Sequence, residues 1–182
     1  MHVFLQGPKN IGKTTVILKT IELLRKNKPI AIGGFFTWKG GNNDRHIYIQ
    51  SAGLAAPALT TQTKNSLSSY EKEIFRLATW DSEQGKLVSN IESFEEIGVH
   101  ILAQSKGVDL IIMDELGNLE SNARLFKKAV LDTLSGTVPV LGALRMGDIP
   151  WHNDIKQNLQ VTLHEVNEKN REALPQVIAG QL

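Results

Sequence analysis

The stretch Gly7-Pro8-Lys9-Asn10-Ile11-Gly12-Lys13-Thr14 decides the fold class of this chain. It fits the pattern Gly-x-x-x-x-Gly-Lys-Ser/Thr of a P-loop, in which backbone N–H groups converge on phosphate oxygens. An apolar run over residues 1–5 precedes it, as expected of a buried strand. Residues 13–27 show helical spacing, and the positive N-terminus of that helix would point at the phosphates. The sequence therefore predicts that the chain binds a nucleoside triphosphate.

Each polar residue of this motif has an expected role. Lys13 is expected to reach the β- and γ-phosphates, and the Thr14 hydroxyl is expected to bind Mg²⁺. Thr15 is placed for a contact nearer the α-phosphate. A glycine-rich turn that binds nothing is the alternative, which is disfavoured because the motif both follows a strand and opens a helix. The predicted binding set is Gly7, Pro8, Lys9, Asn10, Ile11, Gly12, Lys13, Thr14 and Thr15.

A second apolar run, over residues 108–113, is closed by Asp114 and Glu115. In P-loop enzymes an aspartate at such a strand end holds Mg²⁺ opposite the hydroxyl of the loop, so Asp114 is the predicted metal ligand. A neighbouring carboxylate can orient and deprotonate the attacking water, so Glu115 is the predicted general base. Two carboxylates also suit a plain polar turn, but the intact P-loop favours the functional interpretation.

About a hundred residues separate the two motifs. That distance leaves room for at least one additional strand between the P-loop strand and the Asp114 strand. Such a strand, together with a glutamate directly after the aspartate, resembles the branch of P-loop ATPases that has a dedicated catalytic glutamate. Nucleotide kinases often lack that glutamate, because their acceptor is a substrate rather than water. These features favour hydrolysis.

Strand and helix patterns alternate along the rest of the chain. They predict an α/β fold of the three-layer P-loop type, with a mostly parallel sheet, helices on both faces and a hairpin insertion around residues 37–60. We expect one domain over residues 1–182. The predicted strands are 29–37, 47–50, 108–113, 138–144 and 161–166; the predicted helices are 91–104, 122–134 and 155–159, with a last one starting near Asn167 or Asn170.

Bulk composition excludes several classes of protein. Twenty basic and nineteen acidic residues give a formal charge of +1, which argues against a large nucleic-acid surface. The chain has no cysteine, so disulfides and thiolate metal sites are excluded. Neither a signal-peptide pattern nor an apolar run of ~20 residues is present, so a membrane location is not expected. We expect a cytoplasmic protein that is a monomer or a weak oligomer.

Several segments besides the P-loop carry a family likeness, namely Gly34-Phe35-Phe36-Thr37, residues 94–99, Asp114-Glu115-Leu116-Gly117-Asn118-Leu119-Glu120, residues 139–142 and Asn170-Arg171. On these residues the chain resembles the cancer-related nucleoside-triphosphatase family, whose fold is nucleotide-kinase-like. The resemblance spans most of the chain. It implies slow hydrolysis of several nucleoside triphosphates, ATP and GTP among them, with little base preference. It also implies that Arg171 contacts the base or the ribose, whereas the sequence alone favours an ion pair of Arg171 on a helix surface.

Two further positions bear on the site. Residues 38–45 depart from the family, which has a glutamate, an arginine and a glycine-rich turn there; Lys39 and Arg45 are the candidates to replace the positive charge. Arg145 follows the 138–144 strand, so it is a candidate transition-state cation. A solvated surface arginine is an equally weighted alternative for Arg145.

Three activities fit these features. The leading hypothesis is a Mg²⁺-dependent nucleoside triphosphatase. The second is a kinase that transfers the γ-phosphoryl group to a nucleotide or another small molecule. The third is a nucleotide-dependent switch that binds a protein or an RNA. The motifs alone leave the second and third open.

Overall fold

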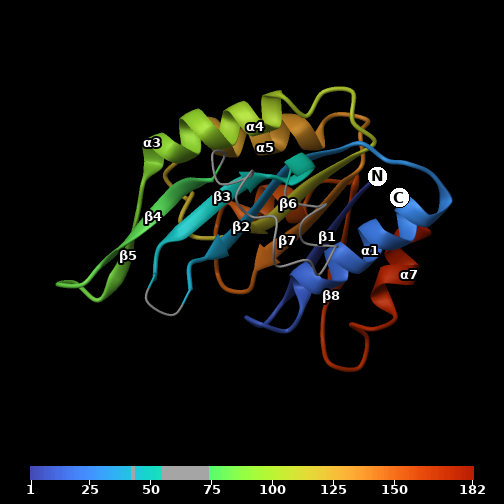
Figure 1. The fold of residues 1–182 in the computed structure, drawn as a ribbon, viewed down its shortest axis with the longest axis horizontal. Coiled ribbons are helices and arrows are strands. Elements are labelled where there is room, and N and C mark those ends of the chain that lie inside the picture. Colours follow the sequence, from blue (N-terminus) through green and yellow to red (C-terminus); the bar gives the residue numbers. More distant parts are fainter. Residues whose placement is uncertain (42–43, 55–73) are drawn as a thin grey trace.

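A twisted sheet forms the centre of the computed structural model, which describes residues 1–41, 44–54 and 74–182 (Figure 1). In this part of the chain the sheet has eight strands in the order β5-β4-β3-β2-β6-β7-β1-β8. The strands are β1 (His2–Gly7), β2 (Ile32–Lys39), β3 (Ile47–Ser51), β4 (Phe75–Asp81), β5 (Lys86–Ser89), β6 (Leu110–Leu116), β7 (Val140–Arg145) and β8 (Val161–Glu165).

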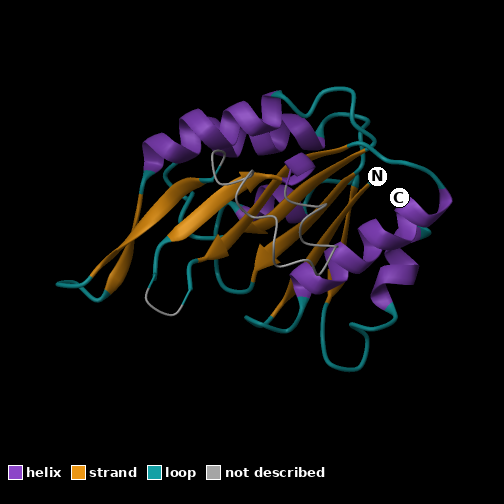
Figure 2. Cartoon of the chain, viewed as in Figure 1, coloured by secondary structure: helices purple, strands orange, loops and turns teal. Residues whose placement is uncertain are grey.

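Helices cover both faces of the sheet, as predicted (Figure 2). On one face lie α1 (Lys13–Asn27) and α7 (Leu174–Ala179). On the other lie α5 (Arg124–Leu134) and a continuous run made of α3 (Ile91–Ser93), the π-helical turn η3 (Phe94–Gly98) and α4 (Val99–Ala103). The short α6 (His152–Lys156) packs against this second face through Ile155. No helix in the described ranges is long and apolar enough to cross a membrane.

Two apolar cores result from the alternation of side chains along the strands. On β1, Phe4 joins the core beneath α5, whereas Val3 and Leu5 join the core beneath α1. Both cores receive buried aliphatic or aromatic residues from β6 and β7 as well. A strand buried on both faces reads as an uninterrupted apolar run, which explains why the central strands were predictable from the sequence.

The five strands β2, β6, β7, β1 and β8 pair in parallel. Strand β7 lies between β1 and β6, so the predicted additional strand between the two motif strands is present. It comes from residues that follow Asp114 in the chain, not from the hundred that precede it. Because all five strands run the same way, the carboxyl ends of β1, β6 and β7 meet at one edge of the sheet.

An antiparallel extension continues the sheet beyond β2. Strand β3 pairs with β2 with Tyr48 opposite Trp38, which confirms the predicted return arm of a hairpin. The extension continues through β4 and β5, which the sequence analysis did not predict. Residues 42–43 and the end of the predicted insertion, from residue 55 onward, lie outside the described residues.

Several predicted boundaries were wrong. Strand β6 extends to Leu116, so the two carboxylates lie within the strand and not after it. The last helix begins at Leu174, because the Asn167 and Asn170 side chains accept hydrogen bonds from loop N–H groups at 2.9–3.1 Å. Such local bonds compete with helix formation. The helix predicted over residues 155–159 is α6, which starts three residues earlier.

Candidate active site

The loop between β1 and α1 depends on its two glycines. A β-carbon on Gly7 would lie 2.7 Å from the carbonyl oxygen of Val166, so only glycine fits beside the end of β8. Gly12 has a φ of 109°, a conformation that side chains with a β-carbon rarely adopt. Helix α1 begins at the next residue, as predicted. The structure thus gives the P-loop sequence the turn between strand and helix that phosphate binding requires.

Lys13 is the centre of the site. Its side chain is only 7% exposed, and its ammonium lies 3.1 Å from the carbonyl oxygen of Gly7 and 3.4 Å from that of Pro8. The same ammonium lies 3.2 Å from Oε2 of Glu115. This ion pair brings the P-loop and the acidic end of β6 together, although about a hundred residues separate them in the chain.

Asp114 lies beside the first turn of α1. It is 2% exposed, and the Thr14 hydroxyl donates a hydrogen bond to its carboxylate. Burial raises the pKa of Asp114 to about 7, with a further rise from the negative charge of Glu115; the Thr14 hydrogen bond and the Lys13 charge act in the opposite direction. The Oδ2 atom of Asp114 is buried and has no hydrogen-bond partner among the described residues.

Glu115 is accessible to water and is held through its backbone. Its side chain is 34% exposed, and its backbone N–H donates to Oγ1 of Thr37 at 3.1 Å. Thr37 belongs to the Gly-Phe-Phe-Thr segment of β2, so this segment supports the residue predicted to be the base. The sequence analysis assigned Thr37 no role of its own, because no local pattern shows that β2 and β6 are neighbours.

Arg145 is the last residue of β7 and is exposed. In the parallel register of β7 and β1 it pairs with Gly7, the first residue of the P-loop. Burial raises the pKa of the carboxyl group of Glu120 to about 7, and the positive charge of Arg145 acts in the opposite direction. The structure therefore places Arg145 at the same sheet edge as Lys13 and Glu115.

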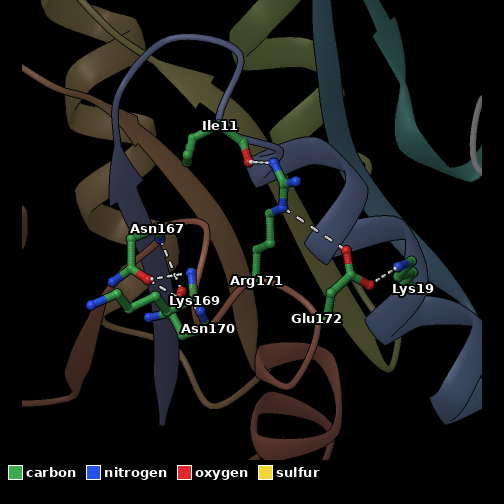
Figure 3. Close-up of polar contacts among 7 residues, drawn as sticks. All are labelled: Ile11, Lys19, Asn167, Lys169, Asn170, Arg171 and Glu172. Atoms are coloured by element: carbon green, nitrogen blue, oxygen red, sulfur yellow. Dashed lines mark hydrogen bonds and ion pairs between the residues drawn. The ribbon is translucent and has the colours of Figure 1, made fainter.

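Arg171 reaches the P-loop from the segment that follows β8 (Figure 3). Its Nη1 donates to the carbonyl oxygen of Ile11 at 3.4 Å, and its Nε lies 3.9 Å from Oε1 of Glu172. Glu172 in turn binds Nζ of Lys19 on α1 at 2.6 Å. Arg171 is thus tied to the outer side of the loop, away from the Lys13–Glu115 pair that lies on the side of β6.

The remaining predicted residues divide into two groups. Pro8, Lys9 and Asn10 are exposed on the loop, and Thr14 and Thr15 are exposed at the start of α1. Of the candidates to replace the family's positive charge, Lys39 is the last residue of β2 and Arg45 lies two residues before β3. Within the described residues no hydrogen bond or ion pair joins either of them to the P-loop, and the Arg45 guanidinium stacks 4.8 Å from the Trp80 ring centroid.

Protein residues alone do not form a complete metal cage in the described part of the chain. No group of three or more histidine, aspartate or glutamate side chains there is arranged to hold an ion. A site with one carboxylate and one hydroxyl suits Mg²⁺, which binds few protein ligands and takes the rest from water and substrate phosphates. The side chains of Asp114 and Thr14 bring one carboxylate and one hydroxyl together in this way.

The chain is similar to known nucleoside-triphosphatases. A family model described as NTPase matches residues 2–179. The nucleoside-triphosphatase THEP1 of Methanosarcina barkeri is 30% identical over 100% of this chain and 97% of its own length. That of Thermotoga maritima is 29% identical over 96% and 91%, and the human cancer-related nucleoside-triphosphatase 28% identical over 97% and 94%.

Two solved structures share the fold. The crystal structure of THEP1 from Aquifex aeolicus superimposes with a TM-score of 0.74 at 20% identity, covering 100% of this chain and 99% of its own. The solution structure of the human cancer-related nucleoside triphosphatase gives a TM-score of 0.71 at 24% identity, covering 99% and 96%. With a family match over nearly all of its length, this chain belongs to the NTPase family.

Proposed function

We propose that this protein is a Mg²⁺-dependent nucleoside triphosphatase that converts ATP, GTP and other nucleoside triphosphates to the diphosphate and phosphate. The observation that carries the proposal is the 3.2 Å contact between Lys13 and Glu115. It joins the phosphate-binding cation to the candidate base within one site. Relatives that match nearly the whole chain are named nucleoside-triphosphatases, which supports the same activity.

Thr14 and Asp114 are the residues that would hold the metal. A buried carboxylate oxygen without a described partner is unusual in a folded protein, and Oδ2 of Asp114 is such an atom. It lies on the carboxylate that already accepts the Thr14 hydroxyl. When bound, Mg²⁺ neutralises charge on the β- and γ-phosphate oxygens.

The P-loop would bind the phosphates through its backbone N–H groups and the Lys13 ammonium. Thr15 would approach the α-phosphate from the first turn of α1. Arg171 would contact the ribose or the base, since it is tied to Ile11 on the outer side of the loop. None of these contacts distinguishes one base from another strongly, which agrees with hydrolysis of several triphosphates.

Glu115 and Arg145 would carry out the chemical step. Glu115 orients a water molecule and takes its proton while the water oxygen attacks the γ-phosphorus and the bond to the β,γ-bridging oxygen breaks. The partial exposure of Glu115 gives water access to it. Arg145, beside Gly7 at the end of β7, would stabilise the charge that builds up on the transferred phosphoryl group.

A turnover assay with the four common nucleoside triphosphates, with and without Mg²⁺, tests the proposal. We expect phosphate release that requires Mg²⁺ and that Glu115→Gln abolishes. Full turnover by Glu115→Gln would contradict the role of the glutamate. Mass spectrometry of the products with added nucleotides and nucleosides provides a second test: a phosphorylated acceptor that forms in place of free phosphate would identify a kinase instead.

A further inference from the structure

The peptide groups of Gly117 are bound on both sides by buried side chains. Gly117 directly follows β6, two residues after Glu115. Its N–H donates to Oε1 of Glu120, and its carbonyl oxygen accepts a hydrogen bond from Nε1 of Trp151 at 2.9 Å. Glu120 is 3% exposed and Trp151 is 7% exposed. Both polar groups of this one residue are therefore bound by side chains that are shielded from water rather than by solvent.

The face of Gly117 where a side chain would stand lies against Arg145, a second residue of the site. A β-carbon built on Gly117 would lie 3.3 Å from Cδ and 3.5 Å from Cβ of Arg145. The register of β6 and β7, which pairs Leu116 with Leu144, explains this proximity. The stem of Arg145 thus packs directly against the Gly117 backbone. Movement of this peptide would displace both Arg145 and the segment that carries Glu115.

Glu120 and Trp151, which together clamp the Gly117 peptide, are themselves held in place by the fold. Trp151 precedes α6 and lies in the core with Ile149 and Ile155. The loop that carries Glu120 is tied to the end of β5, because Oγ of Ser89 donates to the carbonyl oxygen of Leu119 at 2.5 Å. The clamp therefore fixes the end of β6 relative to the core.

Capping of the following helix is the other role open to Glu120, and the contacts disfavour it. Helix α5 begins at Arg124, and its N-cap residue is Ala123, without a side-chain cap. The Glu120 carboxylate instead accepts the N–H of Gly117, which precedes it in the chain. A charged group placed only to favour α5 would be expected to face that helix and the solvent.

We propose that Glu120 and Trp151 are positioning residues that hold the Gly117 peptide so that Glu115 and Arg145 face the γ-phosphate together. The inference rests on the proposed function, because it acts through the residues assigned there to the chemical step. Loss of either clamping bond is expected to lower kcat while nucleotide binding, which depends on the P-loop, stays intact. Small displacements of catalytic groups suffice for such an effect.

The test compares variants that differ in one hydrogen bond. Glu120→Leu removes the acceptor and Trp151→Phe removes the donor while each keeps an apolar side chain in the core. We expect each to lower kcat about 10- to 100-fold, with the affinity for a non-hydrolysable triphosphate analogue within about twofold of the parent protein. Glu120→Gln keeps an oxygen that can accept the Gly117 N–H, so we expect it to restore kcat to within about threefold.

Two matched controls separate positioning from general stability. Glu95 also accepts a backbone N–H, that of Leu125 at 3.1 Å, but in the first turn of α5 and not at the Gly117 peptide. Glu95→Leu should lower the Tm and leave kcat of the folded protein unchanged. Trp80→Phe alters a tryptophan on β4, in the antiparallel extension, and should change neither kcat nor affinity.

The outcomes are distinguishable. Wild-type kcat in folded Glu120→Leu and Trp151→Phe, whatever their Tm, would overturn the positioning role, and Trp151→Phe alone decides the matter if Glu120→Leu does not fold. A loss of kcat in Glu120→Gln as large as in Glu120→Leu would also count against it. Absence of Mg²⁺-dependent phosphate release by the parent protein would overturn the proposed function itself. Collapse of turnover in Glu115→Gln beside normal turnover in Glu120→Leu and Trp151→Phe overturns only this inference.

Discussion

Lys13 and Glu115 form an ion pair, with Nζ of the lysine 3.2 Å from Oε2 of the glutamate, that joins the P-loop to the end of β6. Both groups have assigned partners in the proposed reaction: the ammonium binds phosphate and the carboxylate binds water. Triphosphate and carboxylate therefore compete for the same ammonium. Binding of the nucleotide would release Glu115 from Lys13 and leave it free to act as a base.

The first prediction concerns Glu115→Gln. Because the variant removes the competing carboxylate, it should bind a non-hydrolysable triphosphate analogue at least as tightly as the parent protein, and up to about fivefold more tightly, which matches a partly exposed ion pair worth at most about 1 kcal/mol. Turnover should fall about 100-fold or more. Calorimetric titration and phosphate release measure the two effects. Binding weaker than that of the parent protein would argue against the competition.

Lys13→Ala should reduce both binding and turnover, since no other buried cation lies within the P-loop among the described residues. We expect the affinity for the analogue to fall at least about tenfold, as for loss of a charge-assisted contact of about 1.5–3 kcal/mol. Lys26→Ala, at the far end of α1, is the matched control and should bind normally. Equal affinities of the two variants for the analogue would exclude a role of Lys13 in phosphate binding.

Asp114→Asn should abolish Mg²⁺-dependent turnover and should stabilise the metal-free protein above pH 7. Burial raises the pKa of Asp114 to about 7, well above its value in an unfolded chain. The folded protein therefore holds an extra proton between about pH 4 and pH 7, and this group destabilises the fold progressively as the pH rises through that window, by up to about 4 kcal/mol. Thermal unfolding at pH 5 and pH 8 measures it: the Tm gain of the variant should be clearly larger at pH 8 than at pH 5.

His152 should cause stability to fall in mild acid. Burial lowers its pKa to about 4, with Lys156 acting in the same direction. Below about pH 6.5 the histidine binds a proton in the unfolded chain but not in the folded protein. Stability is therefore lost as the pH falls from 6.5 toward 4, by up to about 3 kcal/mol.

The variant His152→Phe checks this directly. Neither ring nitrogen of His152 has a hydrogen-bond partner among the described residues, so an apolar ring leaves no described group unpaired. The ring also packs edge-on against Trp151 at 4.9 Å, a contact that phenylalanine can make. Its Tm should depend less on pH between 4 and 6.5 than that of the parent protein. A parallel pH dependence of the two proteins would exclude His152 as the cause.

Gly7→Ala should destabilise the protein and impair nucleotide binding. The added β-carbon would lie 2.7 Å from the carbonyl oxygen of Val166, a backbone atom that cannot move without shifting β8. A Tm several degrees lower is expected, as for overpacking that costs about 1–3 kcal/mol. Gly41→Ala, where a β-carbon would meet nothing within 4 Å, is the control and should leave the Tm unchanged.

The parts of this protein that could be predicted from its sequence are those that local patterns encode. The P-loop and α1 follow from glycine spacing and helical periodicity, and the central strands follow from apolar runs. The hairpin of β4 and β5 was not predicted, because its strands leave Phe75 and Val88 exposed and show no clean alternation. Antiparallel strands at the margin of a sheet bury too little to leave a strong signal.

The residues of the site, too, were predictable only where a local motif contains them. Residues within the two motifs could be identified, because each motif is contiguous. Thr37, which holds the Glu115 N–H from 78 residues away, and Trp151, which holds the Gly117 carbonyl from 34 residues away, could not. Tertiary contacts of this kind depend on strand order and on where a loop returns to the core. Neither the strand order nor the return of a loop to the core can be inferred from the spacing of residues in the chain.

The position of β7 in the sheet sets the distance between the strands that carry the P-loop and Glu115. Since one strand stands between β1 and β6, the two strands that deliver the P-loop and Glu115 are two strand spacings apart, or about 10 Å. The Lys13 and Glu115 side chains meet across this separation, at 3.2 Å. Since the two side chains are in contact, a phosphoryl group and a water molecule can lie between cation and base only after this ion pair opens.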